Sequence, residues 1–398
     1  MLQGNMANIN PTHIVETFIG RVTSVVRQMK SASLRKLVVI FPLLQRDAHH
    51  IDTWVSLSVA CRARRIIFYL CPDVENIDSN EVYSFPLHLF SSDNCVKSLC
   101  LRFVSLMLHP GMSNFTNLKK LGLHMVSISG DLQSLLSQCD VLEWLSLTWC
   151  SLPHLIICQP LCRLRYLEVH HCSLQKLDLQ APNLTEFELT NSPIPARLGE
   201  CVNLSVAKIV LLSSSDCFDY VCAELPGALY HVQDTLSINM TIRTEFQGFA
   251  EGVAMFNNVK HLILNIDIEG GTNYSSGILR LTWLLKLAPC LEELELNMYC
   301  HGPPIYVRQL DSSSFLCPHS HLKTVRMTGF YGIRGQLELA LHILRSAKVL
   351  ERLIIDPKIK VAWGPVMDWS VQRLMTVGRL MARLRLFKGE YGRVVTLL

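Results

Sequence analysis

The amino-acid sequence predicts an α/β solenoid, in which stacked repeats form a curved parallel sheet with helices and loops on its convex face. The first observation is a leucine excess: 64 of the 398 residues are leucine, in a chain that is 49% hydrophobic and only 18% charged. This composition excludes intrinsic disorder and requires a large core. The second observation is a motif, Leu-x-x-Leu-x-Leu, that recurs along nearly the whole chain. The third is helical spacing of apolar residues between the motifs.

The repeat is clearest in two consecutive copies of the motif. Leu142 begins the run Leu-Glu-Trp-Leu-Ser-Leu-Thr-Trp-Cys-Ser-Leu, and Leu164 begins Leu-Arg-Tyr-Leu-Glu-Val-His-His-Cys-Ser-Leu, which keeps every apolar position and the cysteine. This is the leucine-rich-repeat signature in its cysteine form. A further match at Leu174 falls between two units, where it could form a separate short strand. The units begin near residues 34, 63, 96, 118, 142, 164, 184, 204, 236, 259, 291, 322 and 350, with weak matches at 63, 204 and 236.

Each unit is expected to contribute one short strand to a parallel sheet, because the fourth and sixth motif residues point to one side of an extended chain. Helical patterns lie between the strands. Asp131 is placed to cap a helix at Leu132, and Leu337, Leu341 and Leu344 follow helical spacing. One repeat cannot bury its own apolar face, so stability must come from stacked neighbours. The spacing therefore predicts a single array rather than several domains.

The segments before and after the array are typical of caps. Ile14, Phe18, Val22 and Val25 follow a helical period, which predicts a helical cap over residues 1–30 in front of an array at 31–360. The basic and apolar sequence of residues 361–398 predicts a second cap, made of a basic helix and a last strand. A basic amphipathic helix could contact a membrane or an acidic partner. A cap with a solvated basic face is the simpler interpretation.

The net charge and the cysteine content limit which class of partner and which compartment are expected. The formal net charge is +4, too small over this length to indicate binding to nucleic acid or to an anionic membrane. The N-terminus lacks a basic stretch followed by an apolar one, so we expect no secretory signal, and no apolar run approaches the length of a membrane span. The 15 cysteines include no Cys-x-x-Cys pair, which fits reduced thiols in the cytoplasm or nucleus.

Motifs of known chemistry are missing from the sequence. It contains no glycine-rich phosphate loop, no Gly-x-Ser-x-Gly and no His-Glu-x-x-His, so we expect no enzymatic activity and no cofactor. The best residual metal candidate is Cys317 with His319 and His321. A zinc site needs four ligands that converge on one point, and a loop before the next strand explains these residues more simply. We therefore expect no metal site.

Several segments together resemble a plant family of F-box and FBD-like leucine-rich-repeat proteins. The resemblance covers residues 13 to 360, and residues 315–360 are similar to the family's FBD-like C-terminal repeats. The segments that carry it are His49–Val55, Ala63–Leu70, Tyr83–Phe90, Leu142–Leu145 with Cys150, Ala181–Leu184, Leu322–Leu339 and Ala347–Leu353.

The resemblance implies a substrate-receptor subunit of a cullin-based ubiquitin ligase. In that family an N-terminal F-box, a helical module that opens with a Leu-Pro pair, docks the ligase adaptor. Here only about a dozen residues precede the first matching segment, so we expect the F-box to be absent. The resemblance thus supports the recognition half of the function, and an adaptor is expected as a partner only if an F-box lies upstream.

Residues beside the fourth and sixth motif positions are expected on the concave face, where a protein substrate would bind. Beyond the main candidates, the same rule places Gly122, Ser146, Thr190, His261, Asn265, Asn297, Arg326, Arg352 and Asp356 there. The main candidates are Lys120, His124, Trp144, Thr148, Tyr166, Glu168, His170, Glu186, Glu188, Glu293 and Glu295.

The most specific hypothesis concerns Trp144 and Tyr166. Units stack in register, so the two aromatics should lie side by side, next to an acidic patch at Glu168, Glu186 and Glu188. Exposed aromatics are enriched among residues that dominate binding energy. The alternative is that a loop covers the rings or that they pack on each other. A small-ligand receptor is the second functional hypothesis, and an apolar cavity above this face would favour it.

Overall fold

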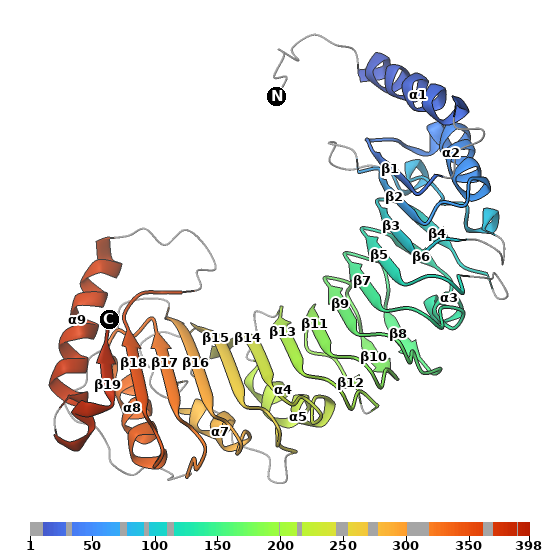
Figure 1. The fold of residues 1–398 in the computed structure, drawn as a ribbon. Coiled ribbons are helices and arrows are strands. Elements are labelled where there is room, and N and C mark those ends of the chain that lie inside the picture. The colour runs from blue at the N-terminus through green and yellow to red at the C-terminus, as the bar shows by residue number, and fades with distance from the viewer. Residues whose placement is uncertain are drawn as a thin grey trace. The chain divides into compact units, whose positions relative to one another are not determined.

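The computed structural model describes most of the chain and divides it into two compact units (Figure 1). Unit 1 is Met1–Leu174 and unit 2 is Gln175–Leu398. The described residues are 11–28, 34–71, 78–90, 95–109, 115–198, 200–212, 217–243, 254–269, 278–300, 318–360, 369–387 and 389–398.

Unit 1 is a parallel sheet with helices on one side (Figure 1). Its strands follow the chain in the order β1, β2, β3, β5, β7 and β9, while β4 pairs separately with β6. The strands are β1 (Lys36–Ile40), β2 (Arg65–Tyr69), β3 (Ser98–Arg102), β4 (Ser105–Met107), β5 (Lys120–His124), β6 (Ser127–Ser129), β7 (Trp144–Thr148), β8 (His154–Ile157) and β9 (Tyr166–His170). The helices are α1 (Pro11–Gln28), α2 (Ala48–Ala60) and α3 (Leu132–Leu136), with short 3-10 turns at Gln45–Asp47, Ser79–Glu81 and Leu87–Leu89.

The register of unit 1 follows from the motif. Leu121 pairs with Leu145, and Leu145 with Leu167, so the fourth motif residues of successive units form one row. Leu145 and Leu147 are fully buried between the sheet and the helical layer. Asp131 caps α3 as expected, because its side chain accepts a hydrogen bond from Gln133 N. The alternation of buried and open positions therefore fixes which side chains face away from the helices.

Unit 2 continues the same pattern with longer strands. Its main sheet runs in the order β11, β13, β14, β15, β16, β17, β18 and β19, and β10 pairs with β12. The strands are β10 (Lys176–Leu179), β11 (Glu186–Asn191), β12 (Ala196–Arg197), β13 (Val206–Leu211), β14 (Thr235–Arg243), β15 (His261–Glu269), β16 (Glu293–Cys300), β17 (Thr324–Thr328), β18 (Arg352–Asp356) and β19 (Val395–Leu397). The helices are α4 (Phe218–Ala223), α5 (Leu225–Ala228), α7 (Leu281–Lys286), α8 (Arg334–Ser346) and α9 (Trp369–Leu386), followed by a 3-10 turn at Gly389–Arg393.

The α/β solenoid architecture is as the repeat predicts, because every predicted unit supplies one strand of a main sheet. The match at Leu174 forms the separate short strand β10. One unit start is wrong. Leu236 pairs with Ala207 and with Leu262, both fourth motif residues, so its unit begins at Gln233 and not at residue 236.

The segment Gly329–Gln336 has a structural role at the end of unit 2. The fully buried Gln336 side chain accepts hydrogen bonds from Tyr331 N (2.8 Å) and Gly332 N (3.1 Å) and donates one to Gly329 O (2.9 Å). Both glycines have positive φ, +65° and +73°, and a Cβ at Gly329 would lie 1.9 Å from the Met298 carbonyl oxygen. The glycine and glutamine positions of the segment therefore build one turn between β17 and α8.

A buried histidine pair lies close in sequence to the turn at Gly329–Gln336. His319 and His342 are 3% and 2% exposed, and their ring centroids are 6.4 Å apart. Neither His319 Nε2 nor the His342 ring nitrogens have a hydrogen-bond partner among the described residues. Burial, with a smaller contribution from His342, lowers the pKa of His319 to about 4, and burial together with Arg345 lowers the pKa of His342. Both rings are therefore neutral at pH 7.

We expect the stability of unit 2 to fall in acid because of this pair. The unfolded chain binds protons at its ordinary histidine pKa of about 6.5, whereas the folded rings do not. The free energy of unfolding is thus fully retained above pH 6.5 and decreases progressively towards pH 4. Urea unfolding of the wild type and of a His319→Phe/His342→Leu variant, measured across this range, tests the prediction. An equally steep loss of stability in the variant would contradict it.

Candidate functional site

The candidate site of unit 1 is built around a stacked aromatic pair on the open side of the sheet. Trp144 and Tyr166, the paired first residues of β7 and β9, stack with ring centroids 5.7 Å apart and planes 4° from parallel. Gly122 leaves room for the indole, since a Cβ there would lie 3.3 Å from Trp144 Cζ3. The rings lie side by side as the repeat predicts. They also pack on each other, the alternative left open by the sequence, and both are half-buried.

A shallow hollow of about 230 Å³ adjoins the indole on the same face. Because Gly122 has no side chain, the floor lies open between β3 and β7. The hollow is lined by polar and apolar groups from β2, β3, β5 and β7. The lining side chains include Tyr69, Cys100, Arg102, His124, Trp144, Ser146 and Thr148.

The charge in this hollow is positive. Burial lowers the pKa of His124, the Arg102 guanidinium lowers it further, and Glu168 acts in the opposite direction. Arg102 Nε is buried and has no hydrogen-bond partner among the described residues. The Arg102 side chain lines the hollow, and a guanidinium group pairs strongly with oxygen acceptors, so the hollow suits a ligand that supplies a carboxylate or carbonyl oxygen.

The other predicted residues of unit 1 surround this feature. Lys120 is exposed at the start of β5, while His124 and Thr148 line the hollow. Glu168 Oε1 lies 3.3 Å from His170 Nδ1, so these two side chains contact each other. Ser146, expected on the same face, lines the hollow and is only 8% exposed.

Two residues of the predicted acidic patch lie in unit 2, and within the described part of the chain only one of them is free of an ion pair with a lysine. Glu186 is exposed, but Glu188 accepts a hydrogen bond from Lys208 Nζ at 2.7 Å. Thr190, expected on the same face, is 7% exposed. Partial neutralisation by Lys208 makes Glu188 a weaker candidate than the sequence indicates, because a surface ion pair offsets its charge.

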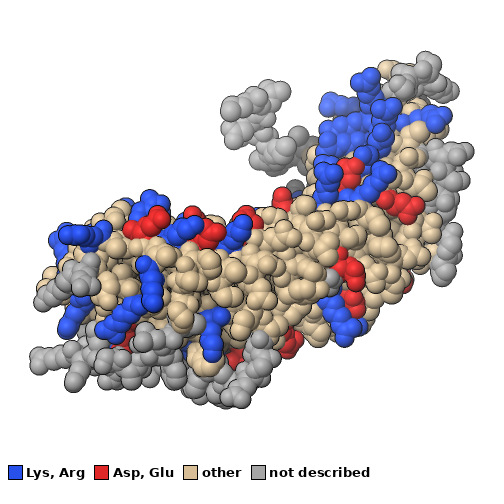
Figure 2. Space-filling model, turned by 60° about the horizontal axis from the view of Figure 1, so that its bottom comes forward, with Lys and Arg blue, Asp and Glu red and all other residues tan. Residues whose placement is uncertain are grey.

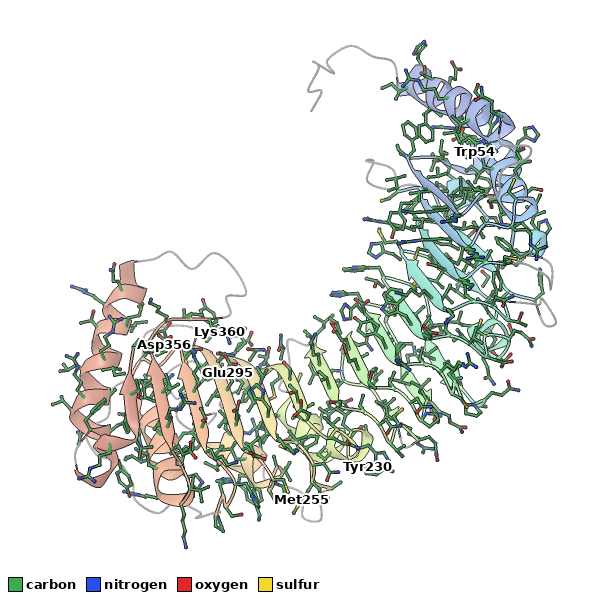
Figure 3. The ribbon with its side chains drawn as sticks, in the orientation of Figure 1. Trp54, Tyr230, Met255, Glu295, Asp356 and Lys360 are labelled. Carbon is green, nitrogen blue, oxygen red and sulfur yellow. The ribbon has the colours of Figure 1, made fainter. Side chains whose placement is uncertain are left out.

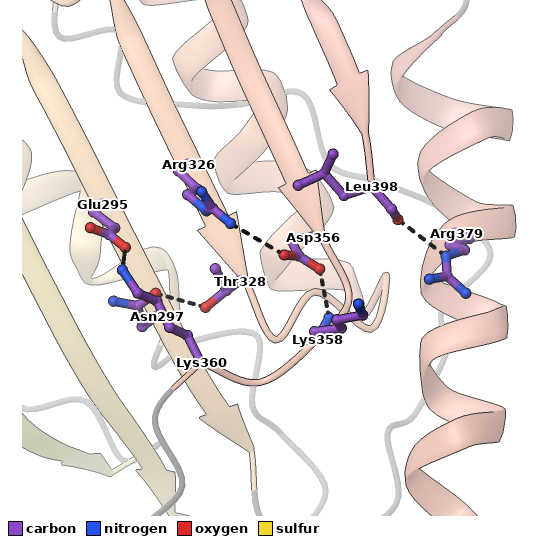
Figure 4. A network of polar contacts seen from close by, with 9 residues as sticks. All are labelled: Glu295, Asn297, Arg326, Thr328, Asp356, Lys358, Lys360, Arg379 and Leu398. Atoms are coloured by element: carbon purple, nitrogen blue, oxygen red, sulfur yellow. Dashed lines mark hydrogen bonds and ion pairs between the residues drawn. The ribbon is translucent and has the colours of Figure 1, made fainter.

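A second polar array lies across β14 to β18 of unit 2 (Figures 3 and 4). Asn265 Nδ2 donates to Asn239 Oδ1 (2.6 Å), Asn297 Nδ2 donates to Asn265 Oδ1 (2.8 Å), and Thr328 Oγ1 donates to Asn297 Oδ1 (2.7 Å). Asn297 is 4% exposed. The row therefore links neighbouring strands to one another and offers little to a partner.

Neighbouring charges in unit 2 are also paired internally (Figure 4). Asp356, 7% exposed, contacts Arg326 and accepts a hydrogen bond from Lys358 N at 3.0 Å. Lys360 binds Glu295, whereas Glu293 stays exposed. Asn297 and Asp356 therefore lie among the polar side chains of one strand face, but their neighbours on the adjacent strands bury most of their surface.

The sequence interpretation missed a row of left-handed residues at the ends of the strands in unit 1. Phe103, Met125, Trp149 and His171 have φ between 51° and 58°. The backbone N–H groups of Phe103, Met125 and Trp149 each donate to the carbonyl oxygen of the last strand residue in the next unit. Trp149 is 56% exposed and stacks on His171, with centroids 4.2 Å apart and planes 8° from parallel. Large residues at positive φ carry a steric cost, so this row marks a second candidate surface beside Thr148.

The tightest cysteine and histidine groups have structural explanations. The Cys150 and Cys172 thiols are buried and donate to the Leu123 and Leu147 carbonyls, each at 3.3 Å. His319 is buried beside His342 and His321 is exposed, while Cys317 lies outside the described residues. Within the described ranges, no three side chains of metal-binding type are grouped closely enough to hold an ion. None of the described helices combines the length and apolar character needed to cross a bilayer.

Comparisons with known proteins agree with the repeat architecture. Residues 25–367 match the family model described as At1g61320/AtMIF1, LRR domain. A comparison with curated proteins found no match. The matched range includes every strand from β1 to β18.

Proposed function

Because the chain belongs to the plant leucine-rich-repeat family At1g61320/AtMIF1, we propose that it is a non-enzymatic scaffold whose unit 1 binds a protein partner. The observation that carries the proposal is the Trp144–Tyr166 stack beside the hollow that Arg102 lines. Aromatic and arginine side chains together dominate the binding energy of many protein interfaces. This arrangement combines both on one open strand face.

The form of the hollow favours a macromolecular partner over a small ligand. Its volume of about 230 Å³ is below the roughly 300–1,000 Å³ of clefts that enclose drug-sized ligands. Its lining mixes Arg102, His124 and Thr148 with the indole of Trp144. A protruding side chain of a protein would fit there while the surrounding face contacts its backbone.

The resemblance to F-box and FBD-like proteins supports a finer proposal about the fate of the partner. On this proposal the chain is the substrate-recognition part of an F-box-type ubiquitin ligase receptor, or of a relative without the F-box. The segment Leu322–Leu339, which carries part of that resemblance, includes the Gly329–Gln336 turn. A ligase adaptor joins only through an F-box segment.

Comparative affinity purification tests the proposal. The full chain, a Trp144→Ala/Tyr166→Ala variant and a Tyr230→Ala variant are each used as bait. Tyr230 is a matched control because it is 41% exposed and lies on the side of unit 2 away from Glu295 and Lys360 (Figure 3). We expect one or more proteins to be recovered by the wild type and the control and lost by the double variant.

The ubiquitin readout separates the coarse proposal from the finer one. If the recovered protein gains ubiquitin when the chain is present, the receptor role is supported. If ubiquitination is unchanged, the ligase role fails and the scaffold role stands. Recovery of the same proteins by the double variant would contradict the scaffold proposal itself.

A further inference from the structure

A cluster of cations occupies the edge of unit 1 where the strands begin. Figure 2 shows Lys and Arg side chains gathered at the N-terminal end of the chain, with few Asp or Glu side chains among them. We name this edge the basic rim and define it by Arg35, Lys36, Arg64, Arg65, Lys97 and Lys120, all of which are exposed.

The backbone places these residues side by side. Arg64 N and Arg65 N both donate to Arg35 O, at 3.1 and 3.2 Å, and Lys97 N donates to Arg64 O at 2.8 Å. Lys120 N donates to Lys97 O at 3.0 Å. Neighbouring strands are about 4.8 Å apart, so the rim spans four strands and about 14 Å.

The fold does not neutralise the rim. No ion pair joins any of the six cations to a carboxylate among the residues that the structure describes. Lys119 adjoins the rim but is not part of it, because its ammonium is paired with Glu143, the residue before β7. Like charges on adjacent strands repel one another, so an anionic partner outside the sheet would reduce this repulsion.

The adjacent aromatic pair and the net charge bear on the choice between two kinds of polyanion. Proteins that hold single-stranded nucleic acid stack bases on open aromatic faces. Here Tyr166 stacks on one face of the Trp144 ring, and the edge of the indole lies over Gly122. The chain also carries a net charge of only +4. Arginine guanidinium groups pair with carboxylates and with phosphates alike, so it is the low net charge that favours an acidic polypeptide over nucleic acid.

We propose that the basic rim binds an acidic segment of a protein, rich in Asp or Glu, that lies across the starts of β1, β2, β3 and β5. The inference rests on the proposed function and specifies the chemistry of the partner. The acidic segment would grip the rim while a neighbouring part of the partner contacts Trp144 and Tyr166.

A labelled oligoglutamate peptide tests the rim directly by fluorescence anisotropy on the full chain. An Arg64→Ser/Arg65→Ser variant removes two rim charges, and an Arg383→Ser/Arg385→Ser variant removes two exposed charges of α9 as a matched control. We expect the rim variant to bind about tenfold more weakly, equal to about 1.4 kcal/mol, and the control to bind like the wild type. Equal affinity of the two variants would overturn the proposal.

One further variant and two further probes complete the test. Arg64→Lys/Arg65→Lys preserves the charge and should bind the peptide more tightly than the serine variant, and a folded lysine variant that binds no better than the serine variant would also overturn the proposal. A labelled oligothymidylate and anionic vesicles are measured in parallel. Tighter, rim-dependent binding of either one than of the peptide would assign the rim to nucleic acid or membrane instead.

The rim test and the test of the proposed function fail separately. If oligoglutamate does not bind but partner recovery still depends on Trp144 and Tyr166, only the inference about the rim is lost. If peptide binding depends on the rim while partner recovery ignores the aromatic pair, the rim stands and the proposed function fails.

Discussion

Replacing Gln336 by alanine is expected to destabilise unit 2 by about 3–5 kcal/mol, because three buried backbone groups lose their hydrogen-bond partner. The side chain accepts from Tyr331 N and Gly332 N and donates to Gly329 O, and it is 0% exposed. An unsatisfied buried polar group costs about 1–3 kcal/mol, and no water can reach the site without opening it. The cavity left by the shortened side chain adds to the loss.

Urea unfolding followed by circular dichroism measures this effect. Gln372→Ala is the control, because Gln372 is an exposed glutamine of α9 whose substitution should change stability by less than about 0.5 kcal/mol. A Gln336→Met variant keeps the volume but not the hydrogen bonds, and should lose most of the same stability. If Gln336→Ala unfolded at the same urea concentration as the control, the structural role assigned to the turn would be wrong.

Replacing Trp144 and Tyr166 together by alanine is expected to weaken partner binding at least a hundredfold, since truncating residues that dominate an interface costs about 2 kcal/mol or more each. The rings are stacked and half-buried, so each holds the other in place. The single substitutions should therefore be non-additive, each losing most of what the double variant loses.

The same variants must remain folded for this result to bear on recognition. Loss of a half-buried stacked pair should lower the free energy of unfolding by about 1–2 kcal/mol, well short of unfolding the chain. Titration calorimetry with the recovered partner gives the affinities, and thermal unfolding gives the stability. Additive losses would mean that the rings act independently, and unchanged affinity would remove them from the interface.

The repeat pattern predicts most of the fold because it combines two periods. Alternation along each strand sets the buried face, and unit spacing sets the register, so Trp144 beside Tyr166 follows from sequence alone. The start at residue 236 fails for a physical reason. In β14 the alternation runs through Thr235–Arg243, so several residues could serve as the fourth motif position, and only strand pairing decides between them.

Burial of polar side chains depends on neighbours that a single unit does not reveal. Asn297 is covered because Asn265 and Thr328 stand beside it on adjacent strands. The hydrogen bonds of Gln336 likewise depend on the path of the loop between β17 and α8. Trp149 could have been found, because the left-handed residues fall at a constant offset of seven from the motif starts at 96, 118, 142 and 164.

Site-specific photo-crosslinking tests the central claim most directly, namely that the open strand face of unit 1 binds a protein. A photoreactive amino acid is placed at Thr148, which lines the hollow, or at Gln138, which is exposed after α3 on the helical side. We predict that the partner recovered by affinity purification is crosslinked from Thr148 and not from Gln138. Equal crosslinking from both positions, or crosslinking from Gln138 alone, would contradict the assignment of this face.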